Sequence, residues 1–103
     1  MTHSLIATFT ALPGRREEVA RLIADFADVV RREEGCLVFQ PFSDADSDHD
    51  FLVYEQYLDE DAFRAHMGNP AGPAFNAALV REIVGDGSQL QFLNEVPEPV
   101  ARG

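Results

Sequence analysis

Lysine is absent from this sequence, and all eight of its cationic side chains are arginines. Its absence excludes any mechanism in which a lysine of this chain forms a Schiff base with a carbonyl substrate. The arginines are outnumbered by 18 acidic residues, which gives a formal net charge of −10. Because such a chain repels phosphate backbones and anionic lipid, we expect neither a nucleic-acid partner nor a membrane partner.

Cysteine and long apolar runs are also scarce. Cys36 is the single cysteine, so no internal disulfide can form, as is typical of proteins in the reducing cytoplasm. No apolar run approaches the roughly 20 residues that a membrane helix needs, and the first residues do not resemble a secretory signal. The histidines and the cysteine lack metal-ligand spacing, and no phosphate-loop or dinucleotide fingerprint occurs, so we expect no metal.

The periodicity of the apolar residues predicts one small domain with a mixed secondary structure. With 103 residues the chain has room for a single core, which we place at residues 1–96, followed by a flexible tail at 97–103. Apolar residues alternate, as in strands, or recur with the 3.6-residue period of helices. The predicted strands cover 3–12, 36–42, 51–57 and 88–96, and the predicted helices cover 15–34, about 60–67, and a segment starting near residue 73.

This order of elements is the split βαβ motif, an α+β ferredoxin-like fold (βαββαβ) with helices on one face of an antiparallel sheet. Pro41 interrupts its strand and indicates an edge strand or a bulge. Strands 3–12 and 51–57 carry apolar residues on both sides, yet the helices can cover only one face. Because an uncovered apolar face is unusual for a monomer, the pattern predicts a homodimer.

Several short segments match the pattern of one family in order and spacing. They are Pro13-Gly14 before the first helix, Glu33-Glu34-Gly35-Cys36-Leu37-Val38-Phe39, Tyr54-Glu55-Gln56-Tyr57, Asp59-Glu60-Asp61-Ala62-Phe63, and Ala65-His66 with Pro70. The sequence thereby resembles the antibiotic-biosynthesis monooxygenase family over nearly its whole length. The resemblance implies a dimeric α+β barrel.

The resemblance leaves the reaction open, because the family includes several chemistries. Some members are quinol or polyketide-anthrone monooxygenases without a cofactor, others degrade haem, and one isomerises a phosphorylated quorum signal. Tyr57 stands where many members carry Trp, and this chain has no Trp, which argues against haem degradation. Ala71-Gly72 replaces a second histidine that members often have after the Pro70 position.

Glu55 is the first candidate catalytic residue. It shares a strand face with apolar residues of segment 51–57, and burial there would raise the pKa of its carboxyl group unless a cation or donors hold it ionised. One interpretation makes it a proton acceptor or the residue that orients His66. The other makes it a structural carboxylate paired with Arg64 or Arg81.

His66 is the second candidate, on the helix that follows this strand and beside Phe63 and Met67. An imidazole titrates near neutral pH and could take a proton from a phenolic hydroxyl, although a lone histidine among apolar residues is often only packed. The family pattern at this position favours the catalytic interpretation. Four aromatic residues are candidates to line a substrate pocket, or simply to pack in the core: Tyr57, Tyr54, Phe39 and Phe92.

These residues lead to three hypotheses. The first is a cofactor-independent monooxygenase that oxidises a small quinol or hydroxylated polyketide with O2. In it His66 acts as the base with the assistance of Glu55, and Tyr57 and Tyr54 orient the ring. The second is a carbonyl isomerase, whose phosphorylated substrate would need an arginine clamp. The third is a non-catalytic module that binds a metabolite.

Overall fold

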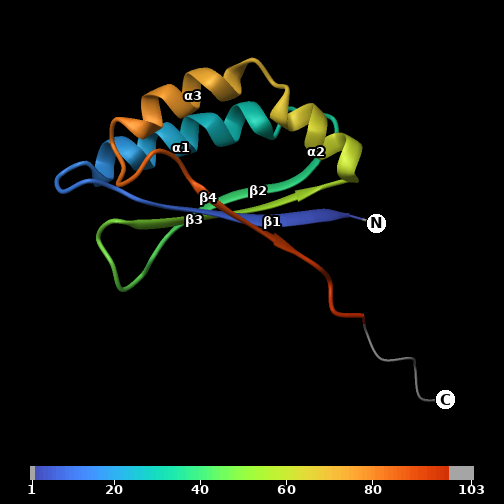
Figure 1. Ribbon diagram of the computed structural model, residues 1–103, viewed down its shortest axis with the longest axis horizontal. Helices are drawn as coiled ribbons and strands as arrows, with labels where there is room; N and C mark the ends of the chain where they lie inside the picture. Colours follow the sequence, from blue (N-terminus) through green and yellow to red (C-terminus); the bar gives the residue numbers. More distant parts are fainter. Residues whose placement is uncertain (1, 98–103) are drawn as a thin grey trace.

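The protein, described here by a computed structural model, has its strands and helices in the order that the sequence predicts, β-α-β-β-α-β (Figure 1). The structure describes residues 2–97, so the predicted tail lies outside the described residues from Glu98 onward. The second helical region is divided into two helices. The elements are β1 (His3–Thr10), α1 (Arg16–Val30), β2 (Cys36–Ser43), β3 (Asp50–Tyr57), α2 (Glu60–Met67), α3 (Ala71–Val80) and β4 (Gln89–Leu93).

The four strands form one antiparallel sheet in the order β2-β3-β1-β4, which is the ferredoxin-like arrangement. Glu55 of β3 stands opposite both Leu5 of β1 and Phe39 of β2. Directly opposed residues share a sheet face, so these three side chains point the same way. β2 is an edge strand, as Pro41 indicated, but the irregularity lies between Cys36 and Val38, and Pro41 stays in register with Val53.

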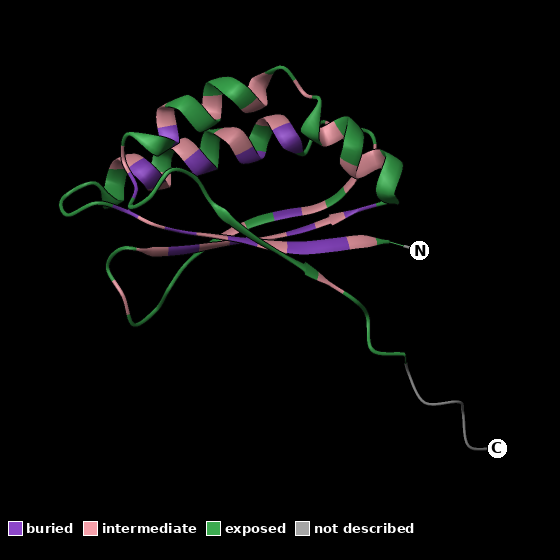
Figure 2. Ribbon diagram, in the orientation of Figure 1, coloured by how far each residue is buried: buried purple, intermediate pink, exposed green. Residues whose placement is uncertain are grey.

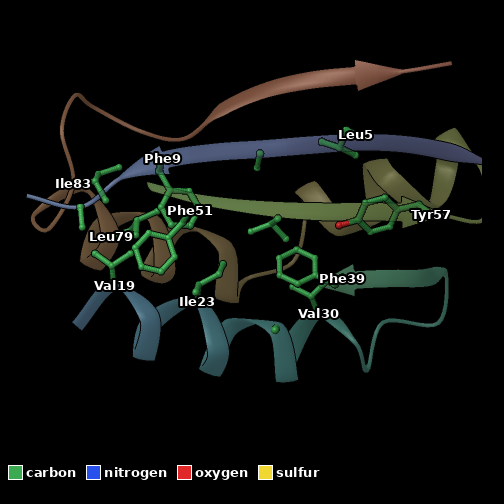
Figure 3. Close-up of a cluster of buried hydrophobic side chains, with 14 residues drawn as sticks. Leu5, Phe9, Val19, Ile23, Val30, Phe39, Phe51, Tyr57, Leu79 and Ile83 are labelled. Carbon is green, nitrogen blue, oxygen red and sulfur yellow. The ribbon is translucent and has the colours of Figure 1, made fainter. Parts of the chain in front are cut away.

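The helices lie together on one face of the sheet, and the core fills the space between the two layers (Figure 1, Figure 3). The buried side chains of α1 form one stripe at the 3.6-residue period of a helix: Val19, Ile23, Ala27 and Val30. Buried residues mark the surfaces where helices and sheet face each other (Figure 2). Amphipathic patterning therefore explains which face of each element carries the core.

α1 ends at Val30, four residues before the end predicted at Glu34. The chain turns between Arg31 and Gly35 so that β2 can begin at Cys36. A Cβ atom added to Gly35 would collide with the Cβ of Ala62 in α2. Only glycine therefore allows this turn to approach α2 so closely.

The sheet face away from the helices is mixed, and the prediction of two apolar faces is only partly right. Ile6, Leu52 and Tyr54 lie on that face, but Ser4, Thr8 and Gln56 alternate with them. The helices leave this face uncovered (Figure 1). The homodimer stays a prediction. Within residues 2–97, no helix combines the length and the apolar character needed to cross a membrane.

Candidate active site

A cavity of about 190 Å³ lies between the helix layer and the sheet. Its walls are mainly apolar, with Phe39 from the sheet and Phe26 and Phe75 from the helices among them. Two ionisable side chains reach it, Glu55 from β3 and His66 from α2. The two residues that the sequence singled out for catalysis therefore face the same space.

Glu55 is 5% exposed, and its carboxylate accepts a hydrogen bond of 2.7 Å from the hydroxyl of Tyr57 at Oε1. The two side chains meet because residues two apart on a strand point to the same face. Burial raises the pKa of the Glu55 carboxyl group, while the Tyr57 hydrogen bond and the nearby His66 oppose that rise. The same burial, together with Glu55 itself, raises the pKa of the Tyr57 hydroxyl far above its usual range.

The alternative interpretation of Glu55, a carboxylate paired with arginine, does not hold. Arg64 forms its ion pairs at the surface, with Glu60 and Asp61 of its own helix. Of the arginines within residues 2–97, Arg81 included, none lies within ion-pair distance of Glu55. The partners of this carboxylate are a phenol and an imidazole.

His66 lies between two carboxylates. Its Nδ1 is 3.0 and 3.1 Å from the two carboxylate oxygens of Glu33, and its Nε2 is 3.7 Å from Oε1 of Glu55. Its ring packs on Tyr57 with centroids 4.9 Å apart. The start of α2, which carries this histidine, is fixed by Asp59, whose side chain accepts a hydrogen bond of 2.8 Å from the backbone N–H of Ala62.

Glu33 is the site residue that the sequence did not single out. It follows α1 and is 33 positions away from His66 along the chain. The amide of Asn69 donates a hydrogen bond of 2.7 Å to Oε2 of Glu33, so a second side chain holds this carboxylate in place. No local spacing predicts the pair, because tertiary folding alone brings the turn before β2 against α2. The one sequence signal for Glu33 was its place at the start of the segment Glu33–Phe39, which matches the family pattern.

The structure separates the four aromatic residues that the sequence proposed for substrate binding. Phe39 lines the cavity, whereas Tyr57 is fully buried next to it with its hydroxyl on Glu55. Tyr54 points to the opposite face of the sheet, because it alternates with Glu55 along β3. Phe92 is 55% exposed on β4, where its ring contacts Phe63. Tyr54 and Phe92 therefore do not line this cavity.

Phe26 and Phe75 take the place of those two residues in the cavity wall. Their rings stack with centroids 4.1 Å apart and an interplanar angle of 3°. They belong to α1 and α3, and nothing in the sequence distinguished a cavity wall from ordinary core. The cavity therefore offers flat aromatic surface from the helix layer.

A larger depression of about 630 Å³ lies at the other end of the sheet, near Thr10 and Phe42. Its ionisable side chains are Asp44 and Asp50, and Asp50 accepts a hydrogen bond from Thr10 that lowers the pKa of its carboxyl group. Without a histidine, this depression offers no base that titrates near neutral pH. Among the described residues no group of three or more histidine, cysteine or acidic side chains could hold a metal ion.

A family model and several solved structures match this chain. The family model described as Antibiotic biosynthesis monooxygenase matches residues 2–78. No curated protein matches the chain significantly. A solved structure of a putative antibiotic biosynthesis monooxygenase from Caulobacter crescentus is 27% identical, with a TM-score of 0.84 over 93% of this chain and 91% of that one. A Pseudomonas aeruginosa protein is 26% identical, with a TM-score of 0.83 over 93% and 95% of the two chains.

A more distant structure carries a functional description. SnoaB from Streptomyces nogalater, described as a cofactor-independent oxygenase, is 20% identical, with a TM-score of 0.81 over 94% of this chain and 95% of that one. At this level of identity the similarity shows a shared fold.

Proposed function

The chain belongs to the antibiotic biosynthesis monooxygenase family, and from this membership and its cavity we propose that it is a cofactor-independent monooxygenase of small quinols or hydroxylated aromatics. The observation that carries the proposal is the convergence of His66 and Glu55 on a mainly apolar cavity with aromatic walls. SnoaB, with the same fold, is described as a cofactor-independent oxygenase, which supports this choice.

The chemistry needs only a base and a dry pocket. His66 accepts the phenolic proton of the bound ring, and the resulting anion is a stronger reductant toward O2 than the neutral phenol. One oxygen atom enters the ring and the other leaves as water. Because no cofactor takes part, the quinol itself supplies all the electrons and is released as a hydroxyquinone. Apolar walls such as Phe26 and Phe75 limit the access of water to the reacting anion.

The charge of the site disfavours the second candidate, an isomerase of a phosphorylated carbonyl compound. A phosphate group would need a cationic partner, yet none of the arginines in residues 2–97 lines the cavity. Glu33 and Glu55, which flank the base, would repel an anion. Neither an isomerase nor a binding module consumes oxygen. A measurement of oxygen uptake therefore separates both from the proposed reaction.

The experiment measures oxygen consumption with a panel of one- and two-ring quinols. We expect His66→Ala to lower turnover at least tenfold, in line with the contribution of a general base. His49→Ala removes an exposed histidine in the loop before β3 and serves as the matched control. Equal turnover in His66→Ala and wild-type protein would remove His66 from the mechanism, and no oxygen uptake with any quinol would remove the proposed reaction.

We also propose that the uncovered sheet face is buried in a homodimer. Partly buried apolar side chains on that face, including Ile6 and Leu52, and the exposed ring of Phe42 support it. Sedimentation at micromolar concentration tests the assembly, and a purely monomeric protein would contradict it. Phe42→Asp should then shift the equilibrium toward monomer, because it would bury a charge at the interface.

A further inference from the structure

We propose that Glu33 is a positioning residue that fixes the tautomer of His66, with the proton on Nδ1 and the free electron pair of Nε2 facing Glu55 and the cavity. The proposal rests on the proposed function only in naming His66 as the base. Which nitrogen of His66 carries the proton does not depend on the reaction.

The carboxylate of Glu33, which faces Nδ1 of the imidazole, can only accept hydrogen bonds. Both carboxylate oxygens of Glu33 lie within 3.1 Å of Nδ1, and an ionised carboxylate has no proton to donate. Nδ1 must therefore be the donor for a hydrogen bond to form. In a neutral imidazole only one nitrogen carries a proton, so this bond leaves Nε2 without one.

Asn69 holds the carboxylate in this role. Its Oδ1 accepts a hydrogen bond of 3.0 Å from the backbone N–H of Ala71, which identifies the other end of the amide as the donor. That donor, Nδ2, lies 2.7 Å from Oε2 of Glu33. The backbone thus orients the amide, the amide orients Glu33, and Glu33 orients His66.

The opposite nitrogen has a weaker contact in the protein. Nε2 is 3.7 Å from Oε1 of Glu55, beyond the range of a good hydrogen bond, and that oxygen already accepts from Tyr57. Nε2 can therefore accept a proton from a ligand hydroxyl. The resulting imidazolium would lie against the Glu33 carboxylate, which stabilises its charge.

The backbone keeps the two partners together. Gly35 lies directly against Ala62, one turn before His66 on α2, and its carbonyl accepts a hydrogen bond of 2.9 Å from the N–H of Leu58. The turn that carries Glu33 is therefore held against the segment that follows β3 and against the first turn of α2. The backbone of the fold therefore holds Glu33 beside His66.

The test is the ¹⁵N NMR spectrum of the His66 ring in wild-type protein, at a pH where the imidazole is neutral. We expect the Nδ1–H tautomer to predominate, whereas free histidine in water prefers Nε2–H. A wild-type spectrum with the proton on Nε2 would overturn the proposal whatever any variant does. Because this measurement needs no substrate, its outcome is independent of whether the protein oxidises quinols.

Glu33→Gln makes the test sharper. The carbonyl of the new amide should face the Asn69 donor, which turns its NH2 group toward Nδ1 and favours the Nε2–H tautomer. Glu34→Gln, at an exposed neighbouring position, changes the net charge equally and is the matched control. We expect the tautomer to change in Glu33→Gln alone. An unchanged tautomer in that variant would refute the positioning role.

Where a quinol substrate is found, Glu33→Gln should lower kcat roughly tenfold or more, because the Nε2–H tautomer has no free electron pair on Nε2 to accept the phenolic proton. KM should change little, because Glu33 does not line the cavity. Equal kcat values for Glu33→Gln and Glu34→Gln would also contradict the proposal. If the tautomer changes as expected but no oxygen is consumed, the proposed reaction fails and the positioning role stands.

Discussion

Tyr57→Phe tests the electrostatics of the buried site directly. The substitution removes one hydroxyl and keeps the ring, which packs 5.5 Å from Phe63 and 4.9 Å from His66 between centroids. The lost interaction is the hydrogen bond of 2.7 Å to Oε1 of Glu55. We expect the free energy of unfolding to fall by about 1.5–3 kcal/mol where Glu55 is ionised, the range for a hydrogen bond to a charged group.

The loss should depend on pH in a defined direction. Burial raises the pKa of Glu55 in the folded protein, so folding takes up a proton, and stability falls as pH rises from the unfolded pKa through the folded one. The Tyr57 hydrogen bond opposes this rise, so Tyr57→Phe moves the folded pKa of Glu55 further up. At acidic pH both proteins carry a protonated Glu55, and the difference should shrink to about 0.5–1.5 kcal/mol.

Urea denaturation of both proteins across this pH range measures the effect. Tyr54→Phe, which removes a hydroxyl from the opposite face of the sheet, is the matched control, and any change in stability that it causes should be the same at acidic and alkaline pH. Combining Tyr57→Phe with Glu55→Gln gives the coupling free energy of the pair. A loss in Tyr57→Phe that is the same at acidic and alkaline pH would refute the electrostatic reasoning.

Two further predictions concern the segments that hold the site. Gly35→Ala should lower the free energy of unfolding by about 1–3 kcal/mol, because its Cβ would collide with Ala62. Thermal unfolding measures this loss. Gly72→Ala, whose Cβ meets no atom within 4 Å, is the control and should not destabilise the protein. Asp59→Ala should cost about 1 kcal/mol through loss of the cap on α2, and an unchanged melting temperature would argue against that cap.

Much of the fold could be predicted because the apolar period of each segment is local. The stripe on α1 and the alternation along β3 assigned the helix-facing residues, and two-residue spacing placed Glu55 and Tyr57 on one face. The ends of elements were less predictable. α1 stops at Val30, and the turn that follows places Gly35 against Ala62, a contact with no signal near residue 30.

The candidate site was only half predictable for a similar reason. His66 and Glu55 stood out by residue type and by their place in the family pattern, and both reach the cavity. Tyr54 and Phe92 were chosen as aromatic residues on strands, but strand alternation placed Tyr54 on the outer face. Phe92 stands opposite Leu5 on the exposed edge strand β4, and only the pairing of β1 with β4 determines that position.

By itself, the sequence determined the order of the elements, the face that each presents to the core, and the residue types available for acid–base chemistry. These properties depend on periods of two or 3.6 residues, which can be recognised within a short segment of the sequence. Tertiary structure alone decided that Glu33 meets His66 and that Asn69 holds Glu33 in place. Those contacts join residues more than 30 positions apart, and they form only when the turn before β2 packs against α2.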